Sequence, residues 1–313
     1  MYPIRSLCYN DDRETFTAIL PSQYLIFRCE PFGMIFSREC EDLSLGNVAT
    51  YNGYRFIALT GSPSPHKFNS KSVRIFDHES GKIKFENQFP DHILTIALGR
   101  NVLICCMNQV TEVWNIETHQ QIQSFKSGMN VHVPMALSHD SSSLIISARN
   151  AKDVYLLTGI SGSVTTKEVE AHSTAVSCVT FSDDGKYFAT AAFSGTTIRI
   201  WDSSTQRCAV LLKRNTSNDI IRAMDFSPTN DFFVSLSNEG VVKVYDIRRK
   251  VSNAKAQTPP VATLELGQQM PMGRICWINS MIIGIISLNG SYYKLSFNGS
   301  SLSNEKITFI SRE

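Results

Sequence analysis

A short strand-like run that ends in an aromatic residue and a small polar one recurs along this chain. The clearest copies are VRIFD at 73–77, EVWN at 112–115, IRIWD at 198–202 and VKVYD at 242–246. They are spaced by about 40 residues or a multiple of that distance, a period typical of β-propeller blades. The repeat therefore favours a ring of small antiparallel sheets over an α/β fold.

The clearest repeat unit occupies residues 171–202. It reads AH, then the runs VSCVTFS, DDGK, YFATAA and TIRIWD, and residues 221–246 repeat the pattern. The Asp184-Gly185 pair is a strong signal for a tight hairpin turn. More divergent units are expected at 6–32, 48–85, 93–125, 134–169 and 273–297, with a closing segment near 307–310. We predict an all-β, seven-bladed β-propeller of the WD-repeat type that forms one domain over residues 1–313.

Composition and motifs exclude several classes of protein. A hydrophobic content of 42% and a charged content of 19% indicate a folded chain. Eight scattered cysteines without CxxC spacing indicate buried thiols in a reducing cytosol. No apolar run approaches the roughly 18 residues of a membrane span, and the first ten residues lack a signal-peptide core. Nucleophile elbows, glycine-rich phosphate loops and metal-ligand spacings are absent, so we expect no enzyme activity, catalytic residue, cofactor or metal.

Positive charge is concentrated in one region of the chain. Residues 203–260 contain nine cations and five acids, a balance of +4 in a chain of net charge +2. Such a field attracts anionic lipid, nucleic acid or an acidic protein, and the alternative is an ordinary solvated face. Within it, Lys213 and Arg214 close the run CAVLL, which we predict to be the outer strand of blade 5. Side chains alternate across a strand, so these two should point to opposite faces.

The tetrapeptide LKRN at 212–215 is part of a wider resemblance. Together with AH at 171–172, GTTIRIWD at 195–202 and KSVRIFD at 71–77, it makes the chain similar to the PROPPIN family. These phosphoinositide-binding seven-bladed propellers include the WIPI autophagy proteins and carry a Phe/Leu-Arg-Arg-Gly signature at the end of blade 5. The resemblance implies one phosphoinositide headgroup on each side of the signature strand, from phosphatidylinositol 3-phosphate or 3,5-bisphosphate.

The resemblance also implies which residues form the two sites. The first site would use Lys213, Arg199, Thr196, Thr197 and His172, and the second Arg214, Ser237, Lys243, Thr216 and Asn218. Phosphates bind charge-assisted donors, and two weak sites on one protein gain avidity at a membrane. Alternatively, Arg199 and Lys243 are half-exposed strand residues, and His172 is the structural histidine found in many WD repeats.

Several positions depart from the family pattern. Lys213 replaces an arginine, so a point charge stands in place of a bidentate fork. Ala192 and Ser194 stand where the family often has a hydroxyl and a cation, and Val241 stands where it often has threonine. We therefore expect Arg214 with Lys243 to form the better-equipped site, and Lys213 the weaker one.

Residues 248–260 correspond to the blade 6 loop by which the family contacts membranes. The cations of this segment are Arg248, Arg249, Lys250 and Lys255, and its few apolar residues are small. Cations near an anionic membrane contribute on the order of 1 kcal/mol each. We expect a loop that assists docking electrostatically, the alternative being a flexible connector.

The resemblance implies a cytoplasmic monomer that acts as an effector and scaffold in autophagy and in endosomal and vacuolar traffic. It would lie peripherally on preautophagosomal, endosomal or vacuolar membranes. It would recruit autophagy proteins, such as a lipid-transfer partner, through loops near blades 2 and 3, where residues 61–68 form a proline-containing loop. The alternative is a WD-repeat scaffold that binds an acidic protein and no lipid. A nucleic-acid partner is disfavoured because no basic and aromatic stacking surface is evident.

Overall fold

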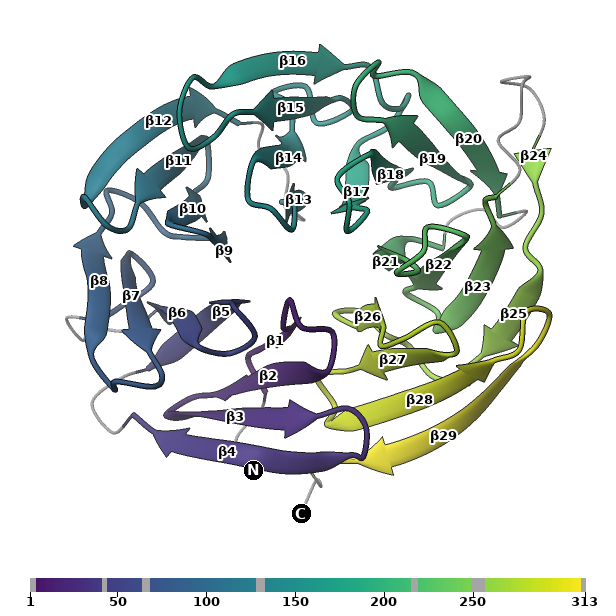
Figure 1. Cartoon of the computed structure of the whole chain (residues 1–313), viewed down its shortest axis with the longest axis horizontal. Coiled ribbons are helices and arrows are strands. Elements are labelled where there is room, and N and C mark those ends of the chain that lie inside the picture. The colour runs from purple at the N-terminus through teal and green to yellow at the C-terminus, as the bar shows by residue number, and fades with distance from the viewer. Residues whose placement is uncertain are drawn as a thin grey trace. The chain divides into compact units, whose positions relative to one another are not determined.

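The computed structural model describes residues 4–40, 44–63, 68–127, 133–214, 219–248 and 257–310. These residues form strands and turns, without any helix. The strands make seven sheets, each built mainly from strands that follow one another in the chain and pair antiparallel (Figure 1). This arrangement confirms the all-β, seven-bladed β-propeller class, with one sheet as each blade.

The chain divides into two compact units, and the first extends to Ser127, with Leu288–Ser291 and the segment from Thr308 onward added to it. It holds three four-stranded sheets. Sheet 1 contains β1 (Ser6–Tyr9), β2 (Thr15–Leu20), β3 (Gln23–Arg28) and β4 (Gly33–Glu39). Sheet 2 contains β5 (Leu45–Tyr51), β6 (Phe56–Gly61), β7 (Ser72–Asp77) and β8 (Ile83–Gln88). Sheet 3 contains β9 (Thr95–Gly99), β10 (Val102–Cys106), β11 (Val110–Asn115) and β12 (Gln120–Lys126).

The second unit covers Gly128–Ser287 and Tyr292–Ile307 and holds the other four sheets. Sheet 4 contains β13 (Met135–Leu137), β14 (Ser143–Ser147), β15 (Val154–Thr158) and β16 (Thr165–Val169). Sheet 5 contains β17 (Val176–Phe181), β18 (Tyr187–Ala192), β19 (Thr197–Asp202), β20 (Cys208–Lys213) and β24 (Gln257–Thr258). Sheet 6 contains β21 (Ile221–Phe226), β22 (Phe232–Ser237), β23 (Val241–Asp246) and β25 (Ala262–Glu265). Sheet 7 contains β26 (Arg274–Trp277), β27 (Ile282–Ile286), β28 (Ser291–Phe297) and β29 (Leu302–Thr308).

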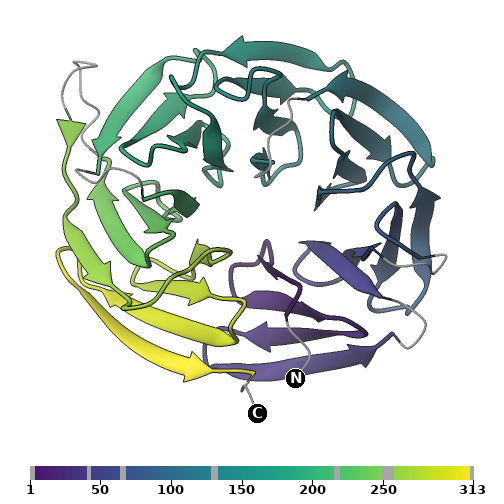
Figure 2. The ribbon, with the colours of Figure 1, turned by 180° about the vertical axis from the view of Figure 1, so that it is seen from behind.

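Neighbouring sheets of the second unit pack face to face in chain order, as the view from behind also shows (Figure 2). Their second strands, β14, β18, β22 and β27, are buried at every position after the first, because both faces are covered. In β18, Phe188 packs in the core between sheets 4 and 5, whereas Ala189 packs in the core between sheets 5 and 6. The latter core also contains Val210 and Leu212 of β20. It therefore places the end of β20 directly beside sheet 6.

Three expectations about strand boundaries were wrong. Blade 1 was expected to end at residue 32, but Gly33–Glu39 forms its fourth strand. The segment Leu302–Thr308 is the fourth strand of sheet 7. Neither strand contains a buried residue, so neither shows the run of buried apolar residues that marks an inner strand. Finally, Cys208–Lys213 is not the last strand of sheet 5, because β24 pairs with it in parallel at Leu211 and Leu212.

Candidate anion-binding site

Lys213 and Arg214 lie on opposite faces at the end of β20. The residues Val210, Leu212 and Arg214 are buried, while Lys213 is exposed. Leu212 belongs to the core shared with sheet 6, so Arg214, two residues further on, is directed toward that sheet as well. The predicted alternation is therefore present, and it separates the two cations by burial as well as by direction.

On the face of Lys213, the residues predicted for the first site come together. Thr197 is the direct cross-strand partner of Lys213, and Arg199 follows two residues later on the same strand. Arg199 is half-buried, and its Nη1 donates a hydrogen bond of 2.5 Å to the carbonyl of Ala171. No carboxylate forms an ion pair with Lys213 or Arg199 within the described part of the chain.

The turn before Thr197 carries two further hydroxyl groups. Thr196 and Ser194 are both half-buried, and their hydroxyl oxygens lie 3.3 Å apart. Ala192, at the end of β18, is buried and has no polar group to contribute. The first group therefore combines two cations with hydroxyls from one turn, a donor set suited to phosphate oxygens.

His172 lies in an internal hydrogen-bonded chain. Its Nε2 lies 2.9 Å from Oγ1 of Thr190, and that oxygen accepts a hydrogen bond of 2.9 Å from Nε1 of Trp201. Burial, assisted by the positive charge of Arg199, lowers the pKa of His172 to about 4. The imidazole is therefore neutral near pH 7 and acts as a link inside sheet 5, in agreement with the structural alternative.

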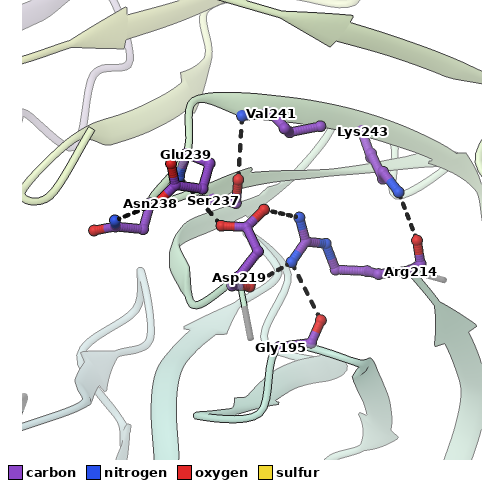
Figure 3. A network of polar contacts seen from close by, with 8 residues as sticks. All are labelled: Gly195, Arg214, Asp219, Ser237, Asn238, Glu239, Val241 and Lys243. Carbon is purple, nitrogen blue, oxygen red and sulfur yellow. Dashed lines mark hydrogen bonds and ion pairs between the residues drawn. The ribbon is translucent and has the colours of Figure 1, made fainter. Parts of the chain in front are cut away.

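The second predicted group is centred on Arg214, which is fully buried, with an exposed fraction of 0%. Its Nη1 donates to the carbonyls of Asp219, at 2.7 Å, and Gly195, at 3.2 Å (Figure 3). Its Nη2 forms an ion pair with Oδ2 of Asp219 at 3.1 Å. The site that the sequence predicted to be better equipped is therefore the less accessible one, because Arg214 is buried and Lys213 is exposed.

Lys243 and Ser237 are also engaged in internal contacts. Nζ of Lys243 donates to the carbonyl of Arg214 at 2.6 Å, and burial, followed by the charge of Arg214, lowers the pKa of this amine. The hydroxyl of Ser237 accepts a hydrogen bond from the backbone N–H of Val241 at 3.1 Å, which closes the turn between β22 and β23. Both side chains are buried.

Some predicted residues lie outside the described part of the chain. These are Thr216 and Asn218 of the second site, and Arg249, Lys250 and Lys255 of the basic loop. Arg248 is described, and its guanidinium pairs with the carboxylate of Asp246, with an Nη2 to Oδ2 distance of 2.5 Å. Its charge is therefore largely compensated by its own strand.

Sequence reasoning missed Asp219, which entered only the charge count. This residue follows Arg214 by five positions. Among the described residues, two carboxylates pair with predicted site cations: Asp246 pairs with the loop residue Arg248, and Asp219 pairs with Arg214. The only signal in the sequence was a single acidic residue that follows two cations and lies two residues before β21. Its importance comes from its contact with Arg214 in the folded protein, which sequence spacing does not reveal.

None of the described residues forms a helix that is long and apolar enough to span a bilayer. The chain matches the sequence model of the PROPPIN family over residues 64–307. It is 22% identical to "Autophagy-related protein 18" of Yarrowia lipolytica, over 95% of this chain and 80% of the relative. Its fold is similar to that of Kluyveromyces lactis Hsv2, with a TM-score of 0.84, 16% identity and coverage of 99% of this chain and 100% of the other. It is also similar to a chain in the complex of KlAtg21 with the coiled coil of AgAtg16, with a TM-score of 0.81, 18% identity and coverage of 98% and 100%.

Proposed function

Because this chain belongs to the PROPPIN family, we propose that it binds phosphatidylinositol 3-phosphate or 3,5-bisphosphate as a non-enzymatic peripheral membrane protein. The observation that carries the proposal is the exposed Lys213, which forms no ion pair with any of the described residues and has Thr197 directly opposite it. An exposed ammonium group beside a hydroxyl offers a phosphate both charge and a neutral donor. Arg199 adds a second positive charge on the same face of sheet 5.

The positive charges on this face of sheet 5 favour an anionic ligand. Arg199 is held by one carbonyl, that of Ala171, which orients the guanidinium without neutralising it. Guanidinium groups present several donors in a fixed plane, so the remaining N–H groups stay available for phosphate oxygens. The surrounding region, residues 203–260, carries an excess of four positive charges that would attract an acidic membrane surface.

A role in autophagy is supported by the relatives of the chain. One of them is named "Autophagy-related protein 18", and one structural neighbour, KlAtg21, is in complex with the coiled coil of AgAtg16. We therefore propose an effector that is recruited to autophagic, endosomal or vacuolar membranes by the headgroup and that in turn recruits autophagy proteins. The loop expected to contribute near blades 2 and 3 includes residues 64–67, which lie outside the described part of the chain.

Vesicle flotation tests the lipid-binding proposal. The protein should float with vesicles that contain phosphatidylinositol 3-phosphate or 3,5-bisphosphate. It should remain at the bottom of the gradient with unphosphorylated phosphatidylinositol or with phosphatidylserine at matched total charge. Equal flotation with phosphatidylserine would show a non-specific electrostatic interaction, and the absence of flotation with all vesicles would reject lipid binding.

A second candidate function is that of a protein scaffold without lipid binding. It is favoured by the structural similarity to a chain that is in complex with a coiled coil. Size-exclusion chromatography with a coiled-coil segment of an autophagy protein, together with the flotation experiment, distinguishes the two functions. Co-elution without flotation would select the scaffold, whereas flotation that depends on Lys213 would select the phosphoinositide effector.

A further inference from the structure

The Arg214 side of β20 already contains an anion, the carboxylate of Asp219. The guanidinium of Arg214 makes three hydrogen bonds to acceptors of the chain itself, two of them with Asp219. The carboxylate therefore provides the charge compensation that a phosphate would supply at this position. In contrast, Lys213 on the other face has no ion pair among the described residues.

Asp219 is itself held in place by the turn of sheet 6. Its Oδ1 accepts a hydrogen bond of 3.2 Å from the backbone N–H of Glu239, which lies between β22 and β23 (Figure 3). The two carboxylate oxygens are thus divided between a backbone donor and the guanidinium of Arg214. A side chain anchored at both oxygens is preorganised for this contact and does not need to be ordered when the pair forms.

Close packing of the sheet 5 turn leaves little space around this pair. Gly195, in the turn between β18 and β19, has a positive φ of 68°, and a Cβ atom there would lie 2.1 Å from the carbonyl oxygen of Asp219. The same added atom would lie 3.5 Å from Nη1 of Arg214. The turn, the backbone carbonyl of Asp219 and the guanidinium of Arg214 therefore form one packed unit.

Lys243, the other cation on the Arg214 side of β20, also has an internal hydrogen-bond partner. The ammonium of Lys243 donates to the carbonyl of Arg214, and Lys243 is buried, with an exposed fraction of 8%. A headgroup that took over these contacts would therefore have to displace an internal acceptor at each of the two cations, whereas the buried Nε of Arg214 has no hydrogen-bond partner among the described residues. Displacing a buried acceptor leaves that group to be resolvated or paired again, which opposes ligand binding.

We propose that Asp219 is a specificity-determining residue that closes the Arg214 side to phosphates, so that this chain binds one phosphoinositide headgroup, on the Lys213 and Arg199 face. The inference rests on the proposed function and deepens it, because it assigns the number and the place of the headgroups. It also reverses the ranking expected from sequence. The site that sequence ranked as better equipped is the closed one, since the carboxylate of Asp219 already pairs with Arg214.

Isothermal titration calorimetry with inositol 1,3-bisphosphate, the soluble headgroup, tests this assignment on the full chain. The wild-type protein should bind one headgroup, and Lys213→Ala should abolish that binding. Asp219→Asn removes the negative charge and retains an oxygen acceptor for the N–H of Glu239, so it should add a second, independent headgroup. Asp231→Asn is the matched control, because it removes the same charge beside sheet 6. Among the described contacts, the carboxylate of Asp231 accepts a hydrogen bond only from the hydroxyl of Thr229, at 2.9 Å. It should leave the stoichiometry at one.

Two headgroups bound by the wild-type protein, or no additional headgroup in folded Asp219→Asn, would overturn the inference. If Asp219→Asn does not fold, the wild type and Lys213→Ala decide the question. The inference is supported if the wild type binds one headgroup and Lys213→Ala binds none, and it is overturned if the wild type binds two. Failure of the proposed function gives a different result. The wild type would then bind no headgroup on either face. If folded Asp219→Asn nevertheless bound one headgroup, Asp219 would be shown to close the Arg214 side even though the Lys213 face binds none.

Discussion

Lys213 and Arg214 are consecutive residues, yet the side chain of Lys213 is exposed and that of Arg214 is fully buried in an ion pair with Asp219. The difference arises because β20 turns alternate side chains toward sheet 6 and away from it. One residue is therefore available to a ligand, and the other contributes to the stability of the contact between sheets 5 and 6. The first predictions separate these two roles.

Removal of the Lys213 ammonium should weaken membrane binding and leave the fold unchanged. A cation near an anionic membrane contributes about 1 kcal/mol even without contacting a headgroup, so Lys213→Ala should reduce the affinity for phosphatidylinositol 3-phosphate vesicles by at least about fivefold. Lys82→Ala is the control, since Lys82 is also exposed and lies in the first unit. Quantitative flotation over a range of lipid concentrations measures both. An equal loss in the two variants would show that only the net charge of the protein matters.

Removal of the Arg214 guanidinium should destabilise the protein. Arg214→Met leaves the largely buried carboxylate of Asp219 without its partner, and breaking a buried pair in this way costs about 3–5 kcal/mol. Lys213→Met, at an exposed position, should change the free energy of unfolding by no more than about 0.5 kcal/mol. Urea denaturation followed by tryptophan fluorescence gives both values. Similar stabilities for the two variants would contradict the structural role of Arg214.

Gly195 should tolerate a side chain far less well than Gly185, although the two have nearly the same backbone conformation. Their φ angles are +68° and +67°, but a Cβ atom at Gly195 would meet the carbonyl of Asp219, whereas none of the chain lies within 4 Å of one at Gly185. Gly185→Ala should cost about 1 kcal/mol, the penalty of the left-handed conformation alone. Gly195→Ala should cost clearly more, because backbone must move. Thermal unfolding of both variants measures the difference, and equal melting temperatures would show that the turn is not packed against Asp219.

The neutral state of His172 should make stability depend on pH. Its pKa in the folded protein, about 4, lies below the value of 6.5 for an unperturbed histidine. The unfolded chain therefore binds the proton first as the pH falls. The stability that this group provides is complete above pH 6.5 and declines progressively toward pH 4, by at most on the order of 3 kcal/mol.

Urea denaturation at several pH values checks this dependence. His172→Gln should show a shallower decline between pH 6.5 and pH 4 than the wild type. His139→Gln is the control, because His139 is exposed and should leave the slope unchanged. A decline that is equally steep in all three proteins would assign the pH dependence to carboxyl groups instead.

Much of the fold was predictable because propeller sheets repeat a local pattern. The runs IRIWD and VKVYD correctly indicated the third strands β19 and β23, and the pair Asp184-Gly185 indicated the turn before β18. The outer strands β4 and β29 were harder to place, since exposed strands carry no apolar repeat. The short strand β24 was not predictable, because its pairing with β20 depends on where the chain lies between β23 and β25 of sheet 6.

The sequence by itself determined the fold class, the position of the two cations at the end of a strand and their opposite directions, since strand periodicity is a local property. Only the tertiary structure decided which cation is open. Burial of Arg214 depends on sheet 6, on the carboxylate of Asp219 and on the space left by Gly195, which three different segments bring together. Charge compensation acts through space, and the Arg214 side is closed because the fold places the carboxylate of Asp219 beside the guanidinium.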